Sequence, residues 1–270
     1  MEKKHILLTN DDGIESPGLW AAAQALAPLG FVHVVAPRQQ FSGAGRSLPG
    51  TSDGKISPRE MFVNGQNWLV HAVGGSPAQS VLHGLLEILP VRPDLVVSGI
   101  NFGENIGNGI TISGTVGAAL EAASYGVPAL AASLETDLQH HFTHSDQVDF
   151  STAAYFVHHF AQWMLNSDPS KLPFDIDVLK VDVPCDATPL TPWKTTRQSR
   201  LPYYLPMVQA RQHLDEPKPI GYRANPNAQY DTPGTDVYAI HVERVVAVTP
   251  LSLDLSSRVN LAELTDLLAH

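Results

Sequence analysis

The chain has 270 residues, of which 43% are hydrophobic and 16% charged, a composition typical of a folded globular protein rather than a disordered one. It carries 17 basic and 27 acidic residues, which gives a net charge of −10. This charge argues against binding to a nucleic acid polymer, because contacts from Lys and Arg to phosphate dominate such binding. A single cysteine, Cys185, excludes an intrachain disulfide framework and a cysteine-rich metal site.

The sequence contains no apolar segment long enough to span a bilayer. Its first apolar run, residues 6–8, ends at polar Thr9 and is too short for the core of a secretion signal. We therefore expect a cytoplasmic protein without a membrane partner.

Strand-like and helix-like segments alternate along the first two thirds of the chain. A strand, a helix and a second strand at the N-terminus predict a right-handed βαβ unit and hence a parallel sheet in an α/β protein. In chain order, the expected elements are a strand over 5–10, a helix over 18–28, a strand over 31–36, a hairpin over 60–73 turning at Asn64-Gly65, a helix over 76–89, a strand over 94–98, a helix over 113–125, a strand over 127–133 and a helix over 148–166.

Beyond residue 184 this alternation fades. Residues 186–235 are rich in Pro, Arg, Tyr and Gln, and they indicate an extended arm or hairpins, whereas strand character returns over 235–249. We therefore expect a single domain, divided into a core of about residues 1–185 and 235–250, an arm over about 186–235, and a C-terminal tail or helix over 251–270.

Polar, glycine-containing loops follow the predicted strands at residues 10–18, 37–48 and 99–112. Because ligands of an open parallel sheet bind beyond the carboxyl ends of its strands, these loops are expected to form one site. In the first loop, the adjacent carboxylates of Asp11 and Asp12 repel each other unless a cation lies between them. The alternative is a solvated turn in which Asp12 caps the next helix.

The third loop leads to Ser113-Gly114-Thr115 at the start of an alanine-rich helix. Free amides and the positive end of the helix dipole favour a phosphate there, although simple capping by Ser113 is also compatible. Neither a P-loop nor a GxGxxG motif is present, and Pro77 excludes a nucleophile elbow at Ser76 because it has no N–H for an oxyanion hole. We interpret the clustered histidines as solvated rather than zinc-binding, namely His140, His141, His144, His158 and His159.

Together these motifs resemble the SurE family of stationary-phase survival proteins. The resemblance covers essentially the whole chain in order. It is carried by Asn10-Asp11-Asp12-Gly13, Pro17-Gly18, Ala36-Pro37, Ser42-Gly43, Ser98-Gly99-Ile100-Asn101, the run from Ser113 to Ala119, Gly126-Val127-Pro128, Thr196-Arg197, Thr235-Asp236, Thr249-Pro250-Leu251 and Asp254-Leu255. It implies a Rossmann-like, mostly parallel sheet with helices on both faces and a C-terminal β-hairpin arm that makes a homodimer or homotetramer.

The resemblance also implies a divalent-metal-dependent phosphatase of nucleoside 5′- and 3′-monophosphates, in some members also of short polyphosphate. It makes Asp11, Asp12, Ser42 and Asn101 the ligands of one Mg²⁺ or Mn²⁺ ion per subunit. Around the substrate phosphate it places Asn10, Gly43, Asn105, Ser113, Gly114 and Thr115. Such an all-oxygen set suits a hard cation, which acidifies a bound water, and we assign Asp11 as the group that takes the water's proton.

The chain departs from the family pattern at Gln79, where an Asp is usual, at Pro49 in place of a Thr, and at Ile112 in place of an aromatic residue. These positions affect the expected substrate preference rather than the reaction class. A catalytically weak nucleotide-binding stress module with the same fold is the alternative function. A purely oligomeric scaffold would leave the glycine-rich loops unexplained.

Overall fold

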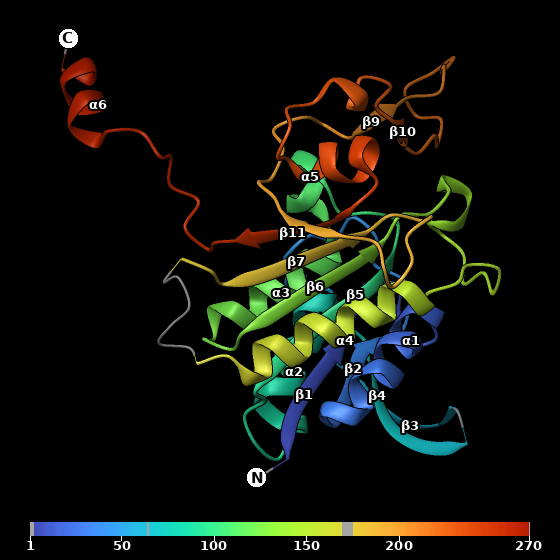
Figure 1. Cartoon of the computed structure of the whole chain (residues 1–270). Helices are drawn as coiled ribbons and strands as arrows, with labels where there is room; N and C mark the ends of the chain where they lie inside the picture. Colours follow the sequence, from blue (N-terminus) through green and yellow to red (C-terminus); the bar gives the residue numbers. More distant parts are fainter. Residues whose placement is uncertain (1–2, 64, 169–174, 270) are drawn as a thin grey trace.

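The computed structural model describes residues 3–63, 65–168 and 175–269, and it shows a central sheet with helices on both faces (Figure 1). In chain order the strands and α-helices are β1 (Lys4–Thr9), α1 (Pro17–Leu26), β2 (Gly30–Pro37), β3 (Ile56–Val63), β4 (Gln66–Val73), α2 (Pro77–His83), β5 (Leu95–Phe102), α3 (Gly114–Ser124), β6 (Ala129–Leu134), α4 (Ser151–Asn166), β7 (Val178–Val183), β8 (Trp193–Thr195), β9 (Tyr204–Met207), β10 (Gly221–Ala224), α5 (Asp236–Tyr238), β11 (Val246–Leu251) and α6 (Leu261–Leu268). Shorter 3₁₀ or π turns occupy Ala27–Leu29, Gly84–Ile88, Gly107–Ile112, Leu138–His140, Ala228–Tyr230 and Ala239–Glu243.

The main sheet has the strand order β3-β4-β2-β1-β5-β6-β7-β11-β8. Its central strands are parallel, whereas β3 pairs antiparallel with β4, and β11 antiparallel with β7. After β1 the chain moves outward to β2 and later returns to the other side of β1 as β5. The order of the strands therefore reverses between β1 and β5, and this switch point is where open α/β sheets bind ligands.

The two faces of the sheet carry separate hydrophobic layers. Along β1, Ile6 and Leu8 pack with residues of α1 and α4, whereas Leu7 packs with residues of α2 and α3. All three side chains are fully buried. Burial on both faces explains why the parallel strands appear in the sequence as short unbroken apolar runs.

The expected mostly parallel α/β fold with helices on both faces is confirmed. Several elements differ from the expectation: β5 extends to Phe102, the predicted helix over 76–89 changes to a π turn at Gly84, and β7 was not predicted. The strand expected over 235–249 is wrong in its first half, since the chain is helical from Asp236 to Glu243. Strands β3 and β4 pair as expected of the hairpin, and its turn residue Asn64 lies outside the described residues.

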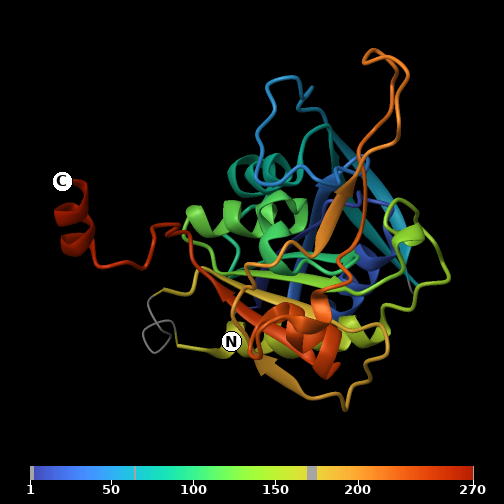
Figure 2. The same cartoon turned by 90° about the horizontal axis from the view of Figure 1, so that it is seen from above.

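Residues 186–235 form an arm only in part. Strand β8 joins the main sheet beside β11, and Tyr203 is buried in a small third core with Val237 and Ile240. The antiparallel pair β9 and β10 forms the expected hairpin, and the loop that joins these strands extends away from the sheet (Figure 2).

The tail that follows β11 leads away from the main sheet and ends in α6 (Figures 1 and 2). Every described side chain of α6 is exposed, including four leucines. Over the ranges that the structure describes, none of the helices has the length and apolar character needed to cross a membrane.

Candidate active site

The chain turns sharply where β1 ends. The side chain of Asn10 closes this turn, since its Oδ1 accepts from the N–H of Gly13 at 3.1 Å and its Nδ2 donates to the carbonyl of Gly13 at 3.0 Å. Gly13 has φ +98°, a conformation that suits glycine. The side chain of Asn10 thus closes the turn and does not line the cavity described below.

Asp11 is fixed against the start of α3. Its Oδ1 accepts a hydrogen bond of 2.5 Å from the hydroxyl of Thr115, and it is only 4% exposed. Gly114 allows this approach, because a Cβ there would lie 2.7 Å from the Cβ of Asp11 and 2.8 Å from its Oδ2. Ser113 caps the helix by accepting from the N–H of Val116 at 3.1 Å. The carboxylate and the N-terminus of α3 are therefore packed as one unit.

Asp12 is held from two other loops. Its Oδ2 accepts from the N–H of Phe102 at 3.1 Å, and its Oδ1 accepts from Nε2 of Gln40 at 3.0 Å. The same nitrogen of Gln40 lies 2.9 Å from Oγ of Ser42 and 2.7 Å from the carbonyl oxygen of His141. Gln40, which was not among the predicted site residues, thus gathers oxygens from three segments.

The two adjacent carboxyl groups lie in an environment that disfavours their charge. Burial raises the pKa of Asp11, while hydrogen bonds from Thr115 and the Gly114 backbone lower it in part. Burial and then the neighbouring Asp11 raise the pKa of Asp12 well above its ordinary value. A cation bound at these groups would offset both effects, because it neutralises the buried negative charge.

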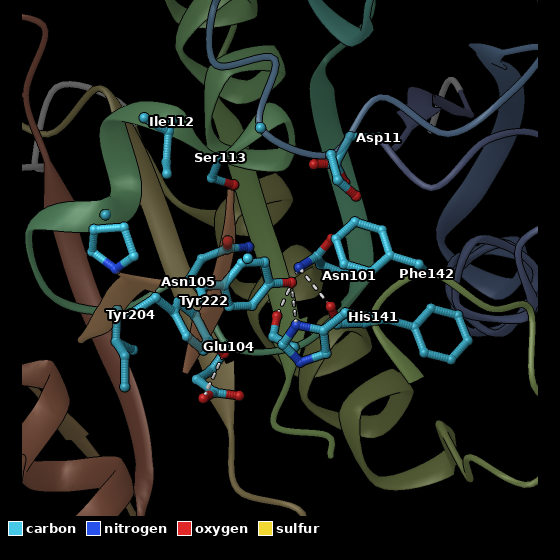
Figure 3. Close-up of a pocket in the computed structure, with 18 of the residues that line it drawn as sticks. Asp11, Asn101, Glu104, Asn105, Ile112, Ser113, His141, Phe142, Tyr204 and Tyr222 are labelled. Carbon is cyan, nitrogen blue, oxygen red and sulfur yellow. Dashed lines mark hydrogen bonds between the residues drawn. The ribbon is translucent and has the colours of Figure 1, made fainter. Parts of the chain in front are cut away.

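A cavity of about 530 Å³ opens beside Asp11. Figure 3 shows Asp11 and Ser113 at one side of the view and Glu104 at the other, with Asn101, Asn105 and Tyr222 between them. The lining comprises Asp11, Ser42, Gly43, Asn101, Phe102, Gly103, Glu104, Asn105, Ile106, Gly109, Ile112, Ser113, His141, Phe142, Tyr204, Pro206, Ile220, Gly221 and Tyr222. The structure thus brings most of the expected site residues to one cavity at the switch point.

The donor atoms near Asp11 fit a hard cation. Asn101 donates from Nδ2 to the carbonyls of Phe102 at 3.2 Å and Gly103 at 2.7 Å, which leaves its Oδ1 available as a ligand. Ser42 is exposed and offers its hydroxyl at the mouth of the same cavity. Carboxylate, hydroxyl and amide oxygens are the ligands that Mg²⁺ and Mn²⁺ prefer.

Asn105 lies on the loop between β5 and α3. Its N–H donates to Oδ1 of Asp182 at 2.8 Å and lies 3.3 Å from Oγ of Ser133, while its Nδ2 is buried with no hydrogen-bond partner. Such an orphaned donor beside a cavity is costly unless a ligand accepts from it. Asn105 therefore has a free N–H group for an anionic ligand.

A buried charge network fixes this loop from behind. Lys180, 1% exposed, pairs closely with Asp182 and lies 3.3 Å from Asp236, whose Oδ2 accepts from the N–H of Gly107 at 3.2 Å. Burial lowers the pKa of Lys180, but the two carboxylates more than offset this effect and raise it. This network was not predicted, although two charged residues in the otherwise apolar run of β7 are a signal for it.

The departures from the family pattern fall in two places. Gln79 belongs to the capping box of α2 with Ser76, and its Nε2 donates to the carbonyl of Pro49 at 3.1 Å. These two departures are therefore in direct contact with each other, and neither residue lines the cavity. Ile112 does line it and is 63% exposed.

The interpretation of all the clustered histidines as solvated is wrong for His141. This residue is buried and lines the cavity, because the segment after β6 folds back over the loops that follow β1 and β2. His144 is exposed, yet its Nε2 donates to the backbone carbonyl of Asp12 at 2.9 Å. No motif or spacing in the sequence predicts either contact.

A second group of potential metal ligands, namely Glu135, Cys185 and Asp186, occurs among the described residues. Arg244 already pairs at 2.6 Å with both carboxylates of this group, those of Glu135 and Asp186. Since this arginine already occupies both carboxylates, the cavity at Asp11 is the better candidate for a cation.

The fold and this site define the class of the protein. It is a doubly wound α/β protein with two adjacent buried carboxylates at the switch point of its sheet and a helix N-terminus packed against one of them. The model of the family described as survival protein SurE matches residues 6–204, and the chain belongs to this family. The family recognised from the sequence motifs is thereby confirmed.

The relatives of known name agree over nearly the whole length. The chain is 41% identical to a protein of Thermococcus gammatolerans, over 97% of the chain and 95% of that protein, and 40% identical to one of Thermococcus kodakarensis, over 97% and 98%. Both relatives are named 5′-nucleotidase SurE. The crystal structure of the SurE protein from Aquifex aeolicus matches with a TM-score of 0.74 at 32% identity, covering 97% of this chain and 99% of that one.

Proposed function

We propose that this chain is a divalent-metal-dependent 5′-nucleotidase, which hydrolyses nucleoside 5′-monophosphates to a nucleoside and phosphate. The observation that carries the proposal is the pair of buried carboxylates, Asp11 and Asp12, beside the N-terminus of α3. The nucleotidase names of relatives at about 40% identity support it. Nucleoside 3′-monophosphates and short polyphosphate are further candidate substrates.

We assign Asp11, Asp12, Ser42 and Asn101 as the ligands of one Mg²⁺ or Mn²⁺ ion. When bound, such an ion supplies positive charge against the phosphate and Lewis acidity at the reacting centre. The site needs this charge, because the protein as a whole carries −10 and its described cavity lining contains no Lys or Arg.

The remaining steps fall to the chain's own side chains and amides. Asp11 accepts the proton of the attacking water. The unpartnered Nδ2 of Asn105 and the positive end of the α3 dipole hold the phosphoryl oxygens, whereas the N–H of Ser113 already donates to the carbonyl of Ile110 at 3.2 Å. Donors fixed in advance stabilise charge in the transition state without reorganisation.

The test is phosphate release from a panel of nucleoside 5′- and 3′-monophosphates with Mn²⁺, Mg²⁺ or EDTA. We expect turnover with a metal, its loss in EDTA, and its loss in Asp12→Asn, which removes one ligand charge. Asp215→Asn, an exposed position on the hairpin loop, is the matched control and retains activity.

An absence of turnover with every metal would reject the phosphatase. If AMP still bound under these conditions, the alternative of a nucleotide-binding module with the same fold would be preferred. Equal activity of Asp12→Asn and wild type would reject the assigned metal site alone.

A further inference from the structure

The cavity has a second, aromatic side, which the phosphate chemistry does not use. Tyr204 of β9 and Tyr222 of β10 pack with ring centroids 5.2 Å apart, and Phe142 lies 6.1 Å from Tyr222. Phe142 is 62% exposed and Ile220 67% exposed, although both line the cavity. Large apolar side chains left exposed around a concave site are typical of ligand pockets.

The hydroxyl proton of Tyr222 is committed to the protein. Its oxygen lies 3.0 Å from Nδ1 of His141, whose Nε2 lies 3.3 Å from the carbonyl oxygen of Thr136. A carbonyl only accepts, so Nε2 carries the ring proton and Nδ1 accepts from Tyr222. Burial lowers the pKa of His141, which keeps the ring neutral and this arrangement in place.

Tyr204 is committed in the same way. Its hydroxyl donates to Oε1 of Glu104 at 2.8 Å. Both tyrosine oxygens of this aromatic side therefore have only lone pairs left for a ligand. A ligand group that donates a hydrogen bond is favoured there, whereas a carbonyl oxygen meets another acceptor.

We propose that Phe142, Tyr204 and Tyr222 form the nucleobase subsite of this cavity, and this proposal rests on the nucleotidase activity proposed above. In this subsite the base packs against the rings, and an exocyclic amino group donates a hydrogen bond to the oxygen of Tyr222. Adenine and cytosine carry an amino group where hypoxanthine and uracil carry a carbonyl oxygen. The subsite therefore selects AMP over IMP and CMP over UMP.

The test compares kcat/KM for AMP, IMP, CMP, UMP and ribose 5-phosphate, which has no base. We expect an AMP-to-IMP ratio of about ten in the wild type, since a mismatched polar edge leaves buried groups unpaired. Tyr222→Phe removes the acceptor and brings the ratio close to one. Phe142→Ala lowers the ratio of AMP to ribose 5-phosphate about tenfold, the effect of losing a stacking partner.

Matched controls are available outside the cavity. Tyr230→Phe and Phe62→Ala alter side chains that are 78% and 75% exposed, and both ratios stay at the wild-type values. The proposal is overturned if Tyr222→Phe leaves the AMP-to-IMP ratio unchanged. It is also overturned if Phe142→Ala reduces ribose 5-phosphate turnover as much as AMP turnover.

Failure of the nucleotidase itself gives a different result, because ribose 5-phosphate would then also release no phosphate with Mn²⁺. In that case, calorimetric binding of AMP and IMP to the wild type and Tyr222→Phe tests the subsite directly. Equal affinities for the two nucleotides in the wild type would overturn it.

Discussion

The hydroxyl of Thr115 donates a hydrogen bond of 2.5 Å to Oδ1 of Asp11, although the two residues are 104 positions apart in the sequence. This bond joins the turn after β1 to the first turn of α3, and Gly114 allows the close approach. Because Asp11 is the proposed metal ligand and α3 the proposed phosphate site, neither site can shift without the other.

Thr115→Val removes this hydrogen bond while it keeps the shape of the side chain. We expect kcat/KM for AMP with Mn²⁺ to fall about 10- to 100-fold, since a hydrogen bond to a charged group contributes about 1.5–3 kcal/mol. The bond lowers the pKa of Asp11 against the effect of burial, so its loss raises that pKa. The acidic limb of the pH–rate profile then moves to higher pH.

Thr115→Ser is the matched control, because it keeps the hydroxyl and retains both the rate and the profile. The prediction is contradicted if the Thr115→Val profile coincides with that of the wild type.

Much of the fold could be predicted because buried parallel strands appear as short apolar runs, as in Ile6–Leu8. β7 was missed because Lys180 and Asp182 interrupt its apolar run. Those charges are stabilised in part by Asp236, which lies 56 positions after Lys180, and a local pattern cannot show such a partner. The segment from Asp236 was predicted as a strand because its residues are mostly apolar. It is helical because its apolar side chains pack in the third core.

The candidate site was predictable to the extent that topology determines it. Asp11 and Ser42 follow strands and Asn101 lies at the end of β5, and because the carboxyl ends of these strands meet, their convergence on one cavity follows from the parallel sheet. No such rule relates His141 or Tyr222 to these loops. They come from an irregular loop and a hairpin, whose positions depend on tertiary contacts.

Lys180→Met tests the charge network behind the β5–α3 loop. The variant leaves the buried carboxylates of Asp182 and Asp236 without their cation, and we expect the free energy of unfolding at pH 7 to fall by about 3–5 kcal/mol. Part of the lost stability is recovered at pH 5. Burial raises the pKa of Asp182 and the variant lacks the cation that opposes this effect, so the variant gains stability as the pH falls.

Urea unfolding of Lys180→Met at pH 7 and pH 5 measures both effects. Lys194→Met is the control, because Lys194 pairs with Glu243 at the surface with 54% of its side chain exposed, and such pairs contribute about 0–1 kcal/mol. Equal destabilisation by the two variants would show that the buried network does not stabilise the fold.

Leu261, Leu264, Leu267 and Leu268 of α6 are 69%, 40%, 75% and 78% exposed and form an apolar face on a short helix. An isolated helix of this length is marginal in water, so a second copy of the chain that covered this face would stabilise it. If the predicted homodimer or homotetramer uses α6, the double variant Leu264→Asp and Leu268→Asp lowers the mass measured by light scattering toward 29.2 kDa. Ala262→Asp, off the apolar face, retains the assembly, and a double variant with the wild-type mass would exclude α6 from the interface.

The buried carboxyl group of Glu104 makes the free energy of unfolding depend on pH. Burial raises the pKa of this carboxyl group to about 7 from an ordinary value of 4.5. Below pH 4.5 the group is protonated in both states, whereas between 4.5 and 7 only the unfolded state ionises fully. Its stabilising contribution is therefore complete below pH 4.5 and is lost as the pH rises through 7, a change of about 3 kcal/mol.

Glu104→Gln removes this titration and keeps an oxygen that accepts from Tyr204. We expect the variant to gain stability relative to the wild type as the pH rises from 4.5 to 7, and the difference to stay constant at higher pH. Thermal unfolding of both proteins at pH 5, 6, 7 and 8 measures the difference. Parallel curves over this range would mean that Glu104 titrates at the same pH in the folded and unfolded chains, and the burial of its carboxyl group would then not be the cause of any pH dependence.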